Sequence, residues 1–181
     1  MRFAVSVICC VLLSTPTAQC ETFKKGIKYL GGAGFPDKKG IRDSWDNGMN
    51  VTEKEITFSF RKNLLPTETV ATSAISKITY GQATTRRVGK WVAVGVIVAP
   101  VALAGIFHKS RQHRILLEWT DSQQRERGIL MQAHKDIFVT LLNDLAFRSG
   151  QPIFADADDR EWLFRNGVKA ELDSAPVTDK K

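Results

Sequence analysis

Few residues in this chain have the types and spacing that catalysis or metal binding needs. The histidines are not spaced as metal ligands, and we expect each of them to be solvated or interfacial. They are His108, His113 and His134. No Ser-centred nucleophile motif and no nucleophile–base pair can be recognised in the sequence. We therefore expect neither a metal site nor catalysis, and an enzyme of unknown type is the least favoured of three functions considered.

Two short motifs partly match ion-binding or phosphate-binding loops. Asp156, Asp158 and Asp159 are spaced like the start of a calcium loop, but its glycine and closing glutamate are missing. Gly31–Gly34 is not followed by the Lys-Ser/Thr pair of a phosphate loop. The aspartates therefore predict a charged tail and the glycines a loop. No cofactor is expected.

The N-terminus has the composition of a secretory signal peptide. Arg2 precedes an apolar run of eleven residues, Phe3–Leu13, which is too short to cross about 30 Å of hydrocarbon. A small-x-small site, Ala18–Cys20, follows before Glu21. We predict export with removal of residues 1–20. Acylation of Cys20 is a weaker alternative, because Gln19 stands where a small residue is expected.

The positions of the cysteines and the net charge limit the kinds of cross-link and the classes of partner that we expect. All three cysteines lie within the first twenty residues, so the mature chain has no disulfide framework. The net charge of +7 indicates an acidic partner. Because the basic residues gather at the ends of one apolar segment and do not alternate with aromatic side chains, nucleic acid is not expected. Anionic lipid head groups are the expected partner, together with an envelope protein as a second candidate.

Alternating apolar residues predict β-strands through the middle of the chain. Thr52–Lys54 and Asp121–Gln124 are expected to turn two hairpins, and Ile75 and Ile78 are expected in the core. The Gly- and Lys-rich stretch 23–44 is expected to be a loop. The predicted strands are 49–51, 56–60, Val70–Tyr80, His113–Thr120 and Gly128–Ala133.

One amphipathic helix is predicted after the strands. Apolar residues recur at helical spacing from Ile137 to Leu145, and Gly150 follows where a helix commonly ends. Asp136 in the first turn and Arg148 in the last turn would suit the helix dipole. Beyond this helix the chain is polar apart from Trp162–Phe164.

Strands in two groups followed by a C-terminal helix are the element order of a pleckstrin-homology-like (PH-like) barrel, in which the helix plugs one open end of a bent sheet. The runs Met49–Phe58, Ile75–Gly81 and Arg86–Gly89 resemble those of uncharacterised exported bacterial proteins with a PH-like or GRAM-like domain. The resemblance covers about residues 48–151. It implies an α+β fold: a PH-like bent antiparallel β-sheet or barrel with one C-terminal α-helix and an apolar insertion between strands.

The predicted organisation therefore has four parts. A signal peptide (1–20) precedes a flexible lead-in (21–47), the PH-like domain (48–151) and a polar C-terminal tail (152–181).

The apolar insertion, Trp91–Phe107, is the strongest functional signal. It contains seventeen residues without a charge, and Pro100 divides it near the middle. Three explanations stay open: a hairpin that dips into a membrane, a single membrane span, or a buried core element. Three basic residues on each side give no orientation and suit a hairpin with both ends on one face.

Two groups of residues are predicted to meet the membrane. The membrane-contacting group is Trp91, Val94, Val98, Val101, Leu103 and Phe107. The basic flank is Arg86, Arg87, Lys90, Lys109, Arg111 and Arg114. We accordingly expect a non-catalytic, membrane-associated binding or scaffold module of the bacterial cell envelope. The alternative is a single-pass envelope protein with two small soluble parts.

Overall fold

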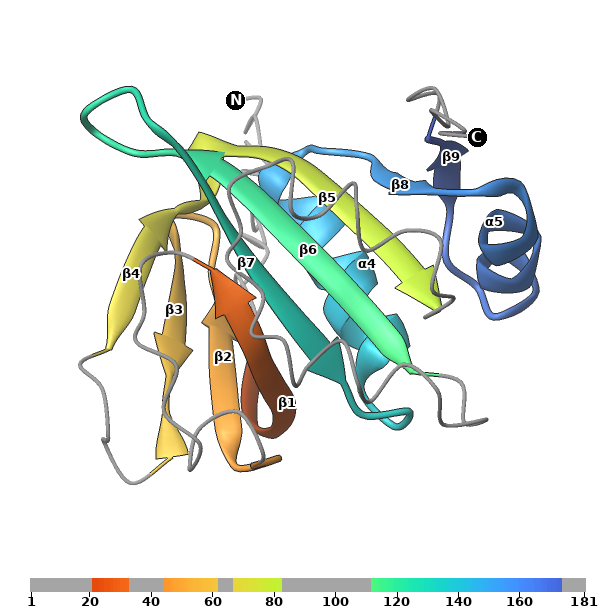
Figure 1. The fold of residues 1–181 in the computed structure, drawn as a ribbon, viewed down its shortest axis with the longest axis horizontal. Helices are drawn as coiled ribbons and strands as arrows, with labels where there is room; N and C mark the ends of the chain where they lie inside the picture. Colours follow the sequence, from red (N-terminus) through yellow and green to blue (C-terminus); the bar gives the residue numbers. More distant parts are fainter. Residues whose placement is uncertain (1–20, 33–43, 62–66, 83–111, 174–181) are drawn as a thin grey trace, which may run out of the picture.

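The computed structural model describes residues 21–32, 44–61, 67–82 and 112–173. Nine strands form one bent, unclosed sheet in the order β4-β3-β2-β1-β7-β6-β5-β8-β9, and helices lie within the bend (Figure 1). The protein is therefore α+β, with the sheet dominant, as predicted.

The first seven strands are β1 (Glu21–Gly32), β2 (Asn47–Val51), β3 (Glu55–Ser59), β4 (Glu68–Ala71), β5 (Ile75–Gln82), β6 (His113–Thr120) and β7 (Glu126–Ala133). The remaining elements are the 3-10 turn η2 (Thr72–Ala74), helix α4 (Phe138–Ser149), strand β8 (Ile153–Ala155), helix α5 (Ala157–Arg165) and strand β9 (Ala170–Leu172).

Strand β1 joins the two halves of the sheet. Its first part pairs with β2 and its second part with β7, and the register shifts between Phe23 and Ile27 and again between Tyr29 and Gly31. Such irregularities bend a strand and increase its twist. At Gly26 the backbone φ is +98°, a value that side chains with a Cβ rarely adopt. The bend lets β4-β3-β2 fold toward β7-β6-β5 around a shared interior.

Residues 21–32 were predicted as part of a flexible lead-in, and this prediction was wrong. Phe23, Ile27 and Tyr29 are buried in the core. Lysines at 24, 25 and 28 separate these apolar residues, and the register shift breaks their alternation. The segment becomes a strand because it has partners on both sides, which a local pattern does not reveal.

Both predicted hairpins are confirmed. β2 and β3 pair directly across the Thr52–Lys54 turn, and β6 and β7 pair along their whole length. In the second turn, Asp121 accepts hydrogen bonds from the backbone N–H groups of Gln123 and Arg125, at 2.8 and 3.0 Å. The backbone N–H of Arg125 and the side chains of Arg127 and Arg125 hold the pKa of Asp121 well below its usual range.

The single strand predicted over Val70–Tyr80 is two strands. The turn η2 interrupts it, so that β4 pairs with β3 while β5 pairs with β6. Ile75 and Ile78 are buried as predicted, at 2% and 0% exposure. β5 continues past the predicted end at Tyr80, through Gly81 to Gln82.

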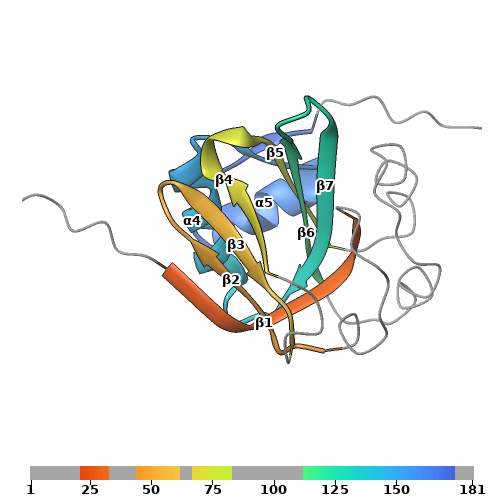
Figure 2. The same ribbon diagram turned by 90° about the vertical axis from the view of Figure 1, so that its left-hand side faces the viewer.

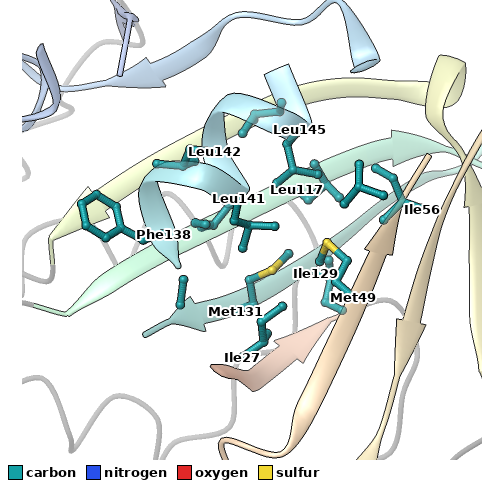
Figure 3. Packing of buried hydrophobic residues seen from close by; sticks show 14 of the residues in the cluster. Ile27, Met49, Ile56, Leu117, Ile129, Met131, Phe138, Leu141, Leu142 and Leu145 are labelled. Atoms are coloured by element: carbon teal, nitrogen blue, oxygen red, sulfur yellow. The ribbon is translucent and has the colours of Figure 1, made fainter. Parts of the chain in front are cut away.

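Helix α4 closes the inner side of the sheet. Leu141, Leu142 and Leu145 have no exposed surface, and they belong to the same buried cluster as Leu117, Ile129 and Met131 on the strands (Figure 3). Gly150 ends the helix with φ +68°, as predicted. The helix begins at Phe138, so Asp136 lies before its first turn and the predicted dipole contact at this end was wrong.

The sequence after α4 was predicted as a polar tail, but residues 153–172 are ordered as β8, α5 and β9. β8 pairs in parallel with β5, and β9 pairs in parallel with β8, so the sheet is mixed and not wholly antiparallel. Asp156 caps α5 by accepting the N–H of Asp159 at 2.9 Å. Leu163 is fully buried. The expectation of one C-terminal helix is therefore corrected to two.

Candidate functional site

The apolar insertion begins and ends at one place on the sheet. β5 ends at Gln82 and β6 begins at His113, and these two residues are paired across the neighbouring strands. The chain between them therefore leaves and rejoins the domain at the same end of the same strand pair (Figure 1). Any surface that the insertion contacts is then approached from this end.

The four central strands β1, β7, β6 and β5 have an inner and an outer face. We call inner the face that carries α4 and α5, which lie on the same side of these strands (Figure 2). Because side chains alternate along a strand, Ile115 and Leu117 point inward while Arg114, Leu116 and Glu118 point outward.

The outer face has an apolar row that belongs to no part of the inner core. Leu30, Leu116 and Leu130 are 8%, 3% and 3% exposed, yet they are not members of the cluster that packs around α4. Among the described residues, no helix lies on this face. The row is a second buried apolar layer beside the base of the insertion.

Arg114 lies next to this row and is the most unusual residue of the outer face. It is 7% exposed. Its Nη2 donates to the side-chain oxygen of Gln112 at 2.7 Å, while its buried Nε has no hydrogen-bond partner. Burial lowers the pKa of its guanidinium. No carboxylate among the described residues forms an ion pair with it.

The cross-strand neighbours of Arg114 add donors and no acids. Arg114 is opposite Gly81 on β5 and Gln132 on β7, and Gln132 is opposite Lys28 on β1. Directly opposite residues have Cβ atoms about 5 Å apart. Lys28 Nζ also lies 4.6 Å from the ring centre of Trp45. We call Arg114, Gln132 and Lys28 the donor row.

The other charged pair of the outer face lies farther along the strands. Lys77 is opposite Glu118, and its ammonium also contacts Asp173 at 3.3 Å. Burial raises the pKa of Glu118, and the nearby Lys77 partly opposes this shift. Glu118 lies four positions along β6 from Arg114, a distance of about 13 Å along the strand.

His113 lies on the inner face, and the expectation that it is solvated or interfacial was wrong. It is 6% exposed and stacks on Phe138 with a centroid distance of 3.9 Å and an interplanar angle of 3°. Its Nδ1 and the hydroxyl of Tyr80 share a hydrogen bond of 2.9 Å. His113 occupies the same inward register as Ile115, so strand alternation determines its burial. His134 is half-exposed and contacts Asp136 at 3.0 Å.

Asp156, Asp158 and Asp159 form neither a charged tail nor a calcium site. Asp156 caps α5, and the buried Asp159 accepts the backbone N–H of Gln82 at 3.0 Å. This contact attaches α5 to the end of β5. Within the described ranges, no three acidic, histidine or cysteine side chains gather as metal ligands.

Arg114 is the one predicted site residue that the structure describes. The sequence assigned it to the basic flank of the insertion, and the structure places it in β6, which extends back to His113 and carries Arg114 into a buried position. The others lie outside the described residues: Trp91, Val94, Val98, Val101, Leu103, Phe107, Arg86, Arg87, Lys90, Lys109 and Arg111. His108 also lies outside them.

Comparisons with known proteins add no relative. No family model, no curated protein and no solved structure matches the chain. In the described part of the chain, no helix has the length and apolar character needed to cross a membrane.

Proposed function

We propose that this chain is an exported, PH-like, non-catalytic binding or scaffold module that is held at a membrane of the bacterial cell envelope. The arrangement of strands supports the PH-like part. Two groups of strands, β2–β4 and β5–β7, are joined through the bent β1, and α4 follows them in the chain and packs inside the bend. Elements β8, α5 and β9 extend this arrangement at the β5 edge.

The pairing of β5 with β6 carries the membrane part of the proposal. Strands that share hydrogen bonds must lie on one side of a bilayer. The segment Trp91–Phe107 connects them, so it can enter a membrane only if both of its ends stay on that side. A dipping hairpin meets this condition and a single crossing does not. This argues against the single-pass alternative.

The composition around the insertion fits an anionic membrane surface. Residues 83–111 contain five lysines and arginines and no aspartate or glutamate. Basic residues next to a membrane-inserted segment are attracted to anionic head groups. The apolar middle would contact the acyl chains and its basic ends the head groups.

An envelope protein is proposed as a second partner. Phe147 on α4 and Phe164 on α5 are 82% and 73% exposed. The side chain of Asn143 on α4 donates a hydrogen bond to the carbonyl of Gly167, just after the end of α5, at 3.3 Å. Exposed aromatic side chains of this kind are enriched in protein interfaces.

Membrane fractionation tests the proposal. The mature protein, produced in an exporting bacterial host, is expected to remain with membranes through high-salt washing and to be released by detergent. A matched variant, in which a Gly-Ser linker replaces residues 91–107, is expected in the soluble fraction, and cooperative thermal unfolding would show that its domain still folds. Release of the unaltered protein by salt alone would contradict membrane insertion and favour packing of the segment on the apolar row of the outer face.

Cysteine labelling tests the hairpin separately. Ser76 and Ser122 are exposed, and the mature chain has no cysteine of its own after removal of residues 1–20. Ser76→Cys and Ser122→Cys are expected to react from the same side with a membrane-impermeant maleimide. If one site reacts in intact cells and the other only after permeabilisation, the insertion is a true span.

A further inference from the structure

Arg114 carries a buried positive charge, and the described residues provide no counter-ion for it. A guanidinium stays charged at any physiological pH, and an unpaired charge in a buried position is strongly destabilising. Buried charges in proteins are usually paired or bound to an ion. Arg114 is buried, its Nε has no hydrogen-bond partner, and its Nη2 donates to the neutral side-chain amide of Gln112.

The neighbouring sequence supplies no counter-ion. The insertion that starts and ends beside Arg114 contains no carboxylate over residues 83–111 and adds further positive charge. Along β6, the first acidic residue on the same face is Glu118, which is opposite Lys77. Asp159 lies near the end of β5, but it belongs to the inner side, where it accepts the N–H of Gln82.

We propose that the donor row, Arg114 with Gln132 and Lys28, is an oxyanion site whose ligand is a phosphate group. These three residues are cross-strand neighbours on three adjacent strands. Gly81, on the fourth strand, places no side chain beside Arg114.

The hydrogen-bond donors and charges of the donor row determine which class of ligand it can bind. Arginine and lysine only donate, and the amide of glutamine can turn its NH₂ group toward an acceptor. A guanidinium presents parallel N–H groups whose spacing matches two oxygens of a phosphate. Two cations in one row suit an anion with more than one negative charge. Arg114 is buried whereas Lys28 and Gln132 are partly exposed, so the ion would be bound between a buried cation and the partly exposed end of the row.

The phosphate could belong to a lipid head group or be free in solution. The lipid source rests on the proposed membrane function, since the donor row lies at the base of the proposed membrane hairpin. The free source does not depend on it. The experiment therefore has two arms.

In the first arm, inorganic phosphate is titrated into the detergent-solubilised mature protein by calorimetry at constant ionic strength. In the second arm, the protein is floated with vesicles of phosphatidylcholine, with and without phosphatidylglycerol. Both arms use the unaltered chain, Arg114→Gln and Arg160→Gln. Arg160 is an exposed arginine on α5 and serves as the matched control.

Arg114→Gln is expected to weaken the binding by about tenfold to a hundredfold, the factor that hydrogen bonds to a charged group contribute. Arg160→Gln is expected to bind like the unaltered chain. Dependence on Arg114 in the first arm identifies free phosphate, and dependence in the second arm alone identifies the lipid. If Arg114→Gln does not fold, Arg114→Lys is used in its place. It keeps the positive charge but lacks the parallel N–H groups of the guanidinium, and the same loss of phosphate binding is expected.

Equal binding by the unaltered chain and a folded Arg114 variant in both arms would overturn the site, as would an absence of binding by the unaltered chain. Retention of the protein in membranes would then still support the proposed function, because that retention depends on residues 91–107. Conversely, Arg114-dependent phosphate binding by a protein that salt washes from membranes would support the site without the membrane function.

Discussion

The inner and outer faces of strands β1, β7, β6 and β5 are both buried at their centres, but they differ in chemistry. The inner face meets α4 with apolar side chains such as Leu117 and Met131. On the outer face, three leucines lie between Arg114 at one end and Glu118 at the other. Burial lowers the pKa of Arg114 and raises the pKa of Glu118. An apolar face needs only packing for its stability, whereas buried charges require a partner. The inner face therefore accounts for folding, and the outer face is where binding should be sought.

The inner face should show the largest effect of a single substitution. Leu141→Ala is expected to lower the free energy of unfolding by about 2–5 kcal/mol, because Leu141 is fully buried between α4 and the sheet. Denaturant unfolding of the solubilised domain measures it. Phe147→Ala on the same helix is the matched control and should change stability by less than about 0.5 kcal/mol, since Phe147 is 82% exposed. Equal effects of the two variants would mean that α4 does not close the core.

The outer apolar row should give a smaller loss. Leu116→Ala is expected to cost about 2 kcal/mol, because a buried leucine side chain loses its transfer free energy even where the surroundings can partly collapse. The same unfolding experiment applies, with phosphate at fixed concentration. A midpoint identical to that of the unaltered chain would show that the outer row is not a sealed layer, and the contrast between the two faces would then be greater.

The elements that sequence reasoning predicted correctly have strong local patterns. Helix α4 follows from its apolar spacing and from Gly150, and the β6–β7 hairpin follows from alternation on both sides of Asp121. α5 has a weaker pattern, but it does have a signature: Asp156 as the cap, two aspartates in the first turn and Arg165 in the last. The three aspartates therefore mark the start of a helix, whereas their spacing alone resembled the start of a calcium loop.

The remaining differences come from pairing between distant segments. β1 is a strand because β2 and β7 both bind it, and its lysines and glycines conceal this locally. Arg114 was assigned to the basic flank because it follows Lys109 and Arg111 closely in sequence. Only the register of β6 against β5 and β7 shows that it is buried next to Gln132. Sequence proximity thus grouped Arg114 with the basic flank but did not show that its side chain is buried.

One buried carboxylate contributes a hydrogen bond to the attachment of α5 to the sheet. Asp159→Ala is expected to destabilise the domain by about 1–2 kcal/mol, because it leaves the backbone N–H of Gln82 without its acceptor at the base of the insertion. Asp158→Ala is the matched control: this neighbour is exposed in the same first turn of the helix, and its loss should cost less than about 1 kcal/mol. Thermal unfolding compares them, and equal midpoints for the two variants would remove Asp159 from this role.

The smallest expected effect is the change in stability on replacing Glu118. The sign of this change tests whether the outer face is desolvated. Burial raises the pKa of Glu118 in the folded state, so the folded protein holds this proton more tightly than the unfolded chain. Stability should therefore decrease as pH rises from the ordinary glutamate pKa through the raised one, and the cost of ionisation is present in full above that window.

The variant Glu118→Gln removes this cost of ionisation. At neutral pH the variant is expected to be more stable than the unaltered chain by less than about 1 kcal/mol, and the difference should disappear below about pH 4, where both side chains are neutral. Lys77 reduces this gain in stability, because in the variant it no longer has the ionised Glu118 opposite it. It keeps its contact with Asp173. Unfolding midpoints across this pH range measure the difference. A variant that is less stable at neutral pH would mean that the interaction with Lys77 outweighs desolvation. Arg114 would then be the only charged group on the described part of the outer face whose burial is uncompensated.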